Sequence, residues 1–197
     1  MRNLNYASAF STKSPYEIYQ EWEGIPAYKD FIVPDLLKLE LGSWDRTGGK
    51  AAFVNMDGTG GTCDTIVEEI APGGQLKAVR HMYEKAVFIL QGQGATTIWN
   101  EGGKKHTLEW QRGSLFSTPL NAWHQHFNAQ GSEPARYLAL KPWGFKFKVE
   151  DLRDTGEDVK KGGAQIEYED QDSEIHKLFV RECETRGAQP RMAMFGT

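Results

Sequence analysis

Hydrophobic and polar positions alternate through the middle of this chain in short runs that are rich in Val, Ile, Thr, Phe and Trp. Turn sequences that contain glycine separate the runs at spacings of about ten residues, and no helical period lies between them. This pattern predicts an all-β antiparallel sandwich or barrel over residues 50–143. The turns are Asp57–Gly61, Pro72–Gly74, Gly92–Gly94, Glu101–Gly103 and Arg112–Gly113.

Residues 1–49 are predicted to form an N-terminal extension with one short helix. Ser14 has the side chain of an N-cap, Pro15 suits the first helical position, and Glu17 lies three residues after the cap. The helix is expected to end near Gly24.

Residues 144–197 are predicted to contain a charged loop followed by a helix. Asp172 or Ser173 can cap this helix, and Gly187 can end it. Its apolar face needs a surface to pack on, which is either the outer wall of the barrel or a partner subunit. That face consists of Ile175, Leu178, Phe179 and Cys183.

Two of the five histidines lie at alternate positions in the segment Gly113–Asn128. Side chains two residues apart on a strand point to the same face, so His124 and His126 are expected to converge. A convergent imidazole pair is a common start of a metal site.

The spacing of Gly113, Pro119, Asn121, His124 and Asn128 resembles the second conserved motif of the cupin superfamily, with asparagine at position 121 where glycine is usual. Residues 72–94 resemble the first cupin motif, and strand-like sequence joins the two. The resemblance covers roughly residues 62–141 and implies a cupin double-stranded β-helix, a jelly-roll barrel with a site inside its mouth. The segment that begins at Gly163 is similar to the connector after the first barrel of two-barrel cupins, so the chain resembles a single-barrel relative of these proteins.

The resemblance places Val79, His81, Lys85 and His124 at the four usual ligand positions, so only two usual metal ligands are kept. An ammonium group is a poor ligand while it is charged, and it repels a divalent cation. Glu84 is one residue away and faces the other side of a regular strand, so it can replace the missing carboxylate only through a bulge.

His126 offers a different ligand set. If the strand is regular, His81, His124 and His126 form a three-histidine facial set, which suits Fe(II) and also Mn, Zn, Ni or Cu. Some cupin dioxygenases work with three histidines and no carboxylate. Alternatively, His126 caps a barrel end and bonds a backbone carbonyl.

Other side chains near the two motifs have functional and structural interpretations. Lys85 or Arg80 can hold an anionic group of a substrate, although a side chain such as Arg80 more often pairs with Glu84 or a neighbour on the solvent face. Tyr83 can serve as a pocket acid or hydrogen-bond donor, or as a structural phenol. Trp99 and Trp123 can shape a pocket for an organic ligand, or pack in the core or rim.

Charge and composition limit the classes of binding partner that this protein is expected to have. The net charge of −4 is mild and no basic stripe is present, so nucleic acid is not expected. No apolar run approaches the roughly 20 residues that span a bilayer, and no signal sequence is evident, so a cytoplasmic location without a membrane partner is expected. Cys63 and Cys183 lie far apart, which argues against a disulfide framework and a thiolate zinc site.

Three functional hypotheses follow. The leading one is a metal-dependent oxidoreductase of the dioxygenase type that acts on a small organic acid or aromatic compound. The second is a hydrolase, lyase or isomerase that uses the metal as a Lewis acid. The third is a metal-free cupin that binds a small ligand, with Lys85 in place of the ion. A homodimer is expected, bridged by the apolar residues 31–33 and 36–37.

Overall fold

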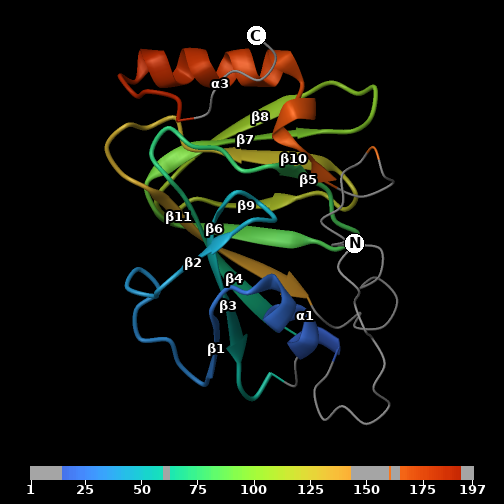
Figure 1. Ribbon diagram of the computed structural model, residues 1–197, viewed down its shortest axis with the longest axis vertical. Coiled ribbons are helices and arrows are strands. Elements are labelled where there is room, and N and C mark those ends of the chain that lie inside the picture. Colours follow the sequence, from blue (N-terminus) through green and yellow to red (C-terminus); the bar gives the residue numbers. More distant parts are fainter. Residues whose placement is uncertain (1–14, 60–62, 143–159, 161–164, 192–197) are drawn as a thin grey trace.

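The computed structural model describes residues 15–59, 63–142, 160 and 165–191, and these residues build two facing β-sheets (Figure 1). The larger sheet has the order β1-β3-β4-β11-β6-β9, with β2 paired to β3, and the smaller has the order β12-β5-β10-β7-β8. All of the strand pairs are antiparallel except β1 with β3. The predicted all-β jelly-roll architecture is therefore confirmed.

The strands from β4 to β11 lie within the predicted range 50–143, whereas β1, β2 and β12 lie outside it. The larger sheet consists of β1 (Ala27–Asp30), β2 (Gly42–Trp44), β3 (Gly49–Met56), β4 (Cys63–Ile70), β6 (Lys85–Gln91), β9 (Leu115–Thr118) and β11 (Ala135–Pro142). The smaller sheet consists of β5 (Ala78–Val79), β7 (Gln93–Trp99), β8 (His106–Gln111), β10 (Trp123–Phe127) and β12 (Gln165–Ile166).

The main core lies between the two sheets. On β4, Ile66 and Ile70 alternate with outward residues and are fully buried, as period-two patterning requires. Val87 and Ile89 on β6 join the same cluster, and Trp110 on β8 reaches it from the smaller sheet. The hydrophobic burial in this cluster holds the two sheets face to face.

The N-terminal segment contributes more than an extension. Helix α1 (Pro15–Glu23) begins at the predicted proline, whereas Ser14 lies outside the described residues. β1 and β2 both pair with β3, so this segment also adds two strands to the larger sheet. The sequence did not reveal them, because strands of four and three residues are too short to show a clear alternation.

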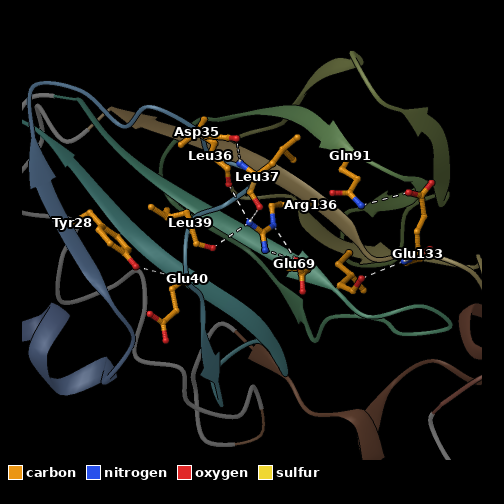
Figure 2. Close-up of polar contacts among 12 residues, drawn as sticks. Tyr28, Asp35, Leu36, Leu37, Leu39, Glu40, Glu69, Gln91, Glu133 and Arg136 are labelled. Atoms are coloured by element: carbon orange, nitrogen blue, oxygen red, sulfur yellow. Dashed lines mark hydrogen bonds and ion pairs between the residues drawn. The ribbon is translucent and has the colours of Figure 1, made fainter.

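Arg136 on β11 fixes the segment that follows β1 against the outer face of the larger sheet (Figure 2). Its Nη1 atom donates to the backbone carbonyls of Leu36, Leu37 and Leu39 at 2.7–3.2 Å. Its Nε and Nη2 atoms donate to the Glu69 carboxylate at 2.9 and 2.6 Å. One planar guanidinium thus donates hydrogen bonds to the carbonyls of a loop and to a carboxylate of the sheet, and joins the two.

Helix α3 (Ser173–Thr185) lies across the outer side of the smaller sheet (Figure 1). Ile175, Phe179 and Cys183 are buried in one cluster with Phe127 of β10, so the helix packs on the barrel of its own chain. Asp172 caps it by accepting a hydrogen bond from the Glu174 N–H at 2.8 Å. Most of the predicted charged loop lies outside the described residues. No described helix is long and apolar enough to cross a membrane.

Candidate functional site

Strand β10 directs two histidines into the barrel. In the regular pairing with β7, His124 lies opposite Ile98 and His126 lies opposite Thr96. The side chains of His124 and His126 are 1% and 3% exposed. The His126 ring centroid is 5.2 Å from that of Tyr137 on the facing sheet, so this ring points into the barrel.

His81 reaches the same place from the segment between β5 and β6. Its ring centroid is 5.2 Å from that of His124, and the His124 and His126 centroids are 5.5 Å apart. The His81 carbonyl accepts a hydrogen bond from the Asn121 N–H at 2.7 Å. Asn121 has φ 58°, a left-handed conformation that asparagine tolerates, which explains how it takes the place of the usual glycine.

Hydrogen bonds orient both β10 histidines. His124 Nδ1 donates to the Ala122 carbonyl at 3.2 Å, so its Nε2 atom carries a lone pair. His126 Nδ1 and the Thr96 hydroxyl are 2.7 Å apart, and the same hydroxyl accepts from Trp110 Nε1 at 2.9 Å. Both Nε2 atoms are buried and have no hydrogen-bond partner among the residues that the structure describes. Two oriented imidazoles with buried, unused nitrogens resemble metal ligands and their supporting partners.

Burial lowers the pKa of both His124 and His126 well below the ordinary value of 6.5. The nearby Lys85 charge lowers both pKa values further, and His81 adds a smaller effect. Both rings are therefore neutral near pH 7, and the neutral imidazole is the form that binds a metal ion.

Lys85 faces the cavity and meets a carboxylate that the sequence reasoning missed. Its Nζ atom lies 3.8 Å from Glu68 Oε1, and each side chain is 4% exposed. Tyr137, opposite Glu68 in the pairing of β11 with β4, has its ring 5.8 Å from the same Nζ atom. Burial and then the Glu68 charge raise the pKa of the Tyr137 hydroxyl well above 10.0, which keeps it protonated.

A signal for Glu68 does exist in the sequence. The residue is in phase with the buried Ile66 and Ile70, so a charged side chain falls on the inner face of an apolar strand. A buried carboxylate needs a cation or hydrogen-bond donors close by, which marks such a position as a functional or structural site.

Tyr83 and Glu84 have different surroundings. The Tyr83 ring stacks on the His81 ring, with centroids 4.6 Å apart and planes 15° apart, so Tyr83 belongs to the cluster. Glu84 directly precedes β6, is exposed and does not line the cavity. The structure therefore does not bring Glu84 to the proposed ligand set.

Arg80, Trp99 and Trp123 lie on the other side of the smaller sheet, so the structure does not place them in the barrel pocket. Trp123 precedes His124 and faces outward by strand alternation; its ring stacks with that of Trp99 at a centroid distance of 6.5 Å. The Arg80 guanidinium lies 4.8 Å over the Trp123 ring and pairs with the exposed Glu101 at 3.2 Å.

A cavity of about 30 Å³ lies between the two sheets at this cluster. As placed, no group of three or more His, Cys, Asp or Glu side chains within the described ranges could hold a metal ion. The donor chemistry of His124 and His126 fits a transition metal, and a third donor is not in position. The cavity lining includes His81, His126, Lys85, Glu68, Tyr83, Tyr137 and Lys141.

Residues 66–141, which carry all of these inward-facing groups, match the family model of the cupin domain. The chain contains a cupin domain. The predicted membership of the cupin superfamily is thus confirmed over these residues.

Solved structures of several proteins align with part of this chain. Over 56% of this chain, the cupin domain of Schizosaccharomyces pombe Cnp3 aligns with 16% identity and a TM-score of 0.46, covering 68% of that protein. An oxalate decarboxylase from Bacillus subtilis aligns with 22% identity and a TM-score of 0.45, also over 56% of this chain but only 30% of that enzyme. The polyketide cyclase RemF from Streptomyces resistomycificus aligns with 16% identity and a TM-score of 0.46, over 56% of this chain and 78% of the cyclase. No curated protein sequence matches this chain.

Proposed function

We propose that this cupin is a metal-dependent enzyme in which His124 and His126 hold a divalent transition metal ion, with Fe(II) favoured over Mn, Zn, Ni and Cu. The observation that carries the proposal is the pair of buried Nε2 atoms on oriented, neutral imidazoles. A buried nitrogen without a partner is costly unless a ligand satisfies it.

His81 is the proposed third ligand, because its ring is next to that of His124, and its side chain would have to shift to complete the set. The bound ion would act as a Lewis acid and bind a small organic acid or aromatic substrate beside dioxygen. Lys85, with Glu68 beside it, would orient an anionic group of the substrate. Tyr137 stays protonated and can donate a hydrogen bond inside the cavity.

A metal-free ligand-binding protein is the second candidate. Lys85 occupies the position of the usual carboxylate ligand, and its ammonium already has Glu68 at 3.8 Å as a counter-ion. A fixed ammonium can take the place of a bound cation and attract an anionic ligand.

Metal analysis of protein purified without a histidine tag tests the proposal. We expect about one ion per wild-type chain, and less than a tenth of that in His124→Gln and His126→Gln, because each change removes a ligand. His106→Gln on β8 is the matched control, because His106 is exposed and far from the cluster in the strand order. A wild-type protein that neither contains nor takes up Fe(II), Mn(II), Zn(II), Ni(II) or Cu(II) would contradict the proposal and favour the second candidate.

Oxygen consumption by the metal-loaded protein tests the type of reaction. With small organic acids and aromatic compounds as candidate substrates, we expect uptake of dioxygen that is lost in His126→Gln. Turnover of a substrate without oxygen uptake would instead favour a hydrolase, lyase or isomerase that uses the metal as a Lewis acid.

A further inference from the structure

Lys141 is a buried lysine on the inner face of β11 that the proposed function does not use. It lies four residues after Tyr137 on the same strand, so both side chains face the barrel interior. The residue is 7% exposed and lines the cavity together with Lys85, His81 and His126.

No acceptor of a hydrogen bond or ion pair contacts the Lys141 ammonium within the described part of the chain. Asp64 lies opposite Lys141 in the pairing of β4 with β11, but no ion pair within 4.0 Å joins them. The Lys141 Nζ atom lies over the face of the Tyr83 ring, 5.6 Å from the ring centroid. A cation–π contact of this kind supplies no counter-charge, so the Lys141 ammonium keeps its full positive charge.

The other cationic side chains that line the cavity each have a carboxylate. Lys85 pairs with Glu68 at 3.8 Å, Lys77 pairs with Glu167 at 2.8 Å, and Arg46 pairs with Glu23. Lys141 therefore supplies an excess positive charge to the described lining of the cavity. An anionic ligand is the chemical class that such a charge favours.

We propose that Lys141 is a specificity-determining residue that binds the carboxylate of an anionic substrate in this cavity, with Lys85 as its neighbour. The inference rests on the proposed function, because it names the substrate class of the same site. The cavity is small, about 30 Å³, so only the carboxylate group enters it and the rest of the substrate lies outside. Lys85 is partly neutralised by Glu68, so Lys141 provides the larger share of the attraction.

The test uses trifluoroacetate as a small carboxylate probe and trifluoroacetamide as its uncharged counterpart. Fluorine NMR titration of chelator-treated protein gives the dissociation constant of each probe without metal coordination. We expect wild type to bind trifluoroacetate at least tenfold more tightly than trifluoroacetamide. Lys141→Met should weaken trifluoroacetate binding at least tenfold and leave trifluoroacetamide binding unchanged, because the methionine keeps most of the volume and loses the charge.

Lys77→Met is the matched control, because Lys77 lines the same cavity but has Glu167 as its own counter-ion. Its affinity for trifluoroacetate should stay within twofold of wild type. Equal trifluoroacetate affinity in wild type and Lys141→Met, or no preference of wild type for the anion, would overturn the inference. Lys141→Arg keeps the charge and should retain more than half of the preference for trifluoroacetate over trifluoroacetamide. A complete loss of this preference in Lys141→Arg would also contradict the inference.

Metal content is measured separately in the same proteins. If metal uptake is normal and Lys141→Met does not change anion binding, the inference about Lys141 is refuted and the proposed metal site is not. Absence of metal with a clear effect of Lys141→Met refutes the proposed metal site and leaves the anion site in place.

Discussion

At the residue scale, the two β10 histidines combine features that folding alone does not favour. His124 and His126 are buried, and their Nε2 atoms have no partner in the part of the chain that the structure describes; both rings are neutral near pH 7 because burial lowers their pKa. Thr96 and the Ala122 carbonyl nevertheless fix the orientation of the rings. Retaining oriented but unsatisfied groups in a core is typical of a binding site.

The lowered pKa values predict that the metal-free protein loses stability in mild acid. Below pH 6.5 the unfolded chain binds protons at His124 and His126, while the folded state does not. The free energy of unfolding therefore falls as the pH drops from 6.5 towards the lowered pKa values, by up to about 1.4 kcal/mol per pH unit for each histidine. Urea denaturation at pH 7.5, 6.5 and 5.5 measures this slope.

His126→Gln should make the slope between pH 6.5 and 5.5 smaller, because one of the two groups is removed. His106→Gln is the control variant, since His106 is exposed and lies on β8, away from the cluster. Identical slopes in wild type and His126→Gln would show that His126 titrates normally in the fold.

At the element scale, α3 covers the outer face of the smaller sheet. Phe179 lies 5.6 Å from Phe127 between ring centroids, and Ile175 and Cys183 extend the same contact. Burial of this face is what holds the helix in place. The outer side of β10 is thereby covered, while its inner side carries the histidines.

The N-cap of α3 should contribute measurably to stability. Asp172 accepts hydrogen bonds from Lys105 Nζ and from the Glu174 N–H. Both bonds lower the pKa of the Asp172 carboxyl below 3.8, and the bond from Lys105 has the larger effect. Asp172→Ala should lower the free energy of unfolding at pH 7 by about 1 kcal/mol. The effect should disappear as the pH falls through the lowered pKa, because the protonated carboxyl is a weaker acceptor.

Lys105→Ala separates the cap from the ion pair. Both partners of that pair are more than a third exposed, so this change should cost less than Asp172→Ala in thermal or urea unfolding. An equal cost for the two variants would show that the ion pair, and not the cap, stabilises the helix.

At the scale of the whole molecule, the expected homodimer remains a prediction. In one half of the proposed bridge, Arg136 fixes the backbone by binding the carbonyls of Leu36 and Leu37, while Leu37 stays 42% exposed. The other half is open: Phe31 and Ile32 are 73% and 65% exposed. Exposed apolar side chains side by side favour burial against a second copy.

Sedimentation velocity tests the dimer. We expect the double variant Phe31→Ser, Ile32→Ser to weaken association at least tenfold relative to wild type, because it removes the apolar contact. Leu108→Ser on β8 serves as the control, because Leu108 is also exposed but lies in the smaller sheet. A wild-type protein that stays monomeric at high micromolar concentration would contradict the prediction.

Local sequence patterns determined much of this protein. Strand alternation predicted the inward direction of both His124 and His126, because side-chain direction on a strand depends only on position in the strand. Turn spacing predicted the barrel, and the cap and apolar face predicted α3. The cupin motifs predicted the place of His81.

The tertiary structure alone decided which groups meet inside the barrel. Glu68, Tyr137 and Lys141 come from β4 and β11 of the facing sheet, so no spacing near the motifs reveals their approach to the histidines. Strand pairing also set the surroundings of Trp123, whose outer face meets Arg80 instead of a ligand pocket. Periodicity fixes the face of one strand, but the packing of two sheets brings charges from distant parts of the chain together.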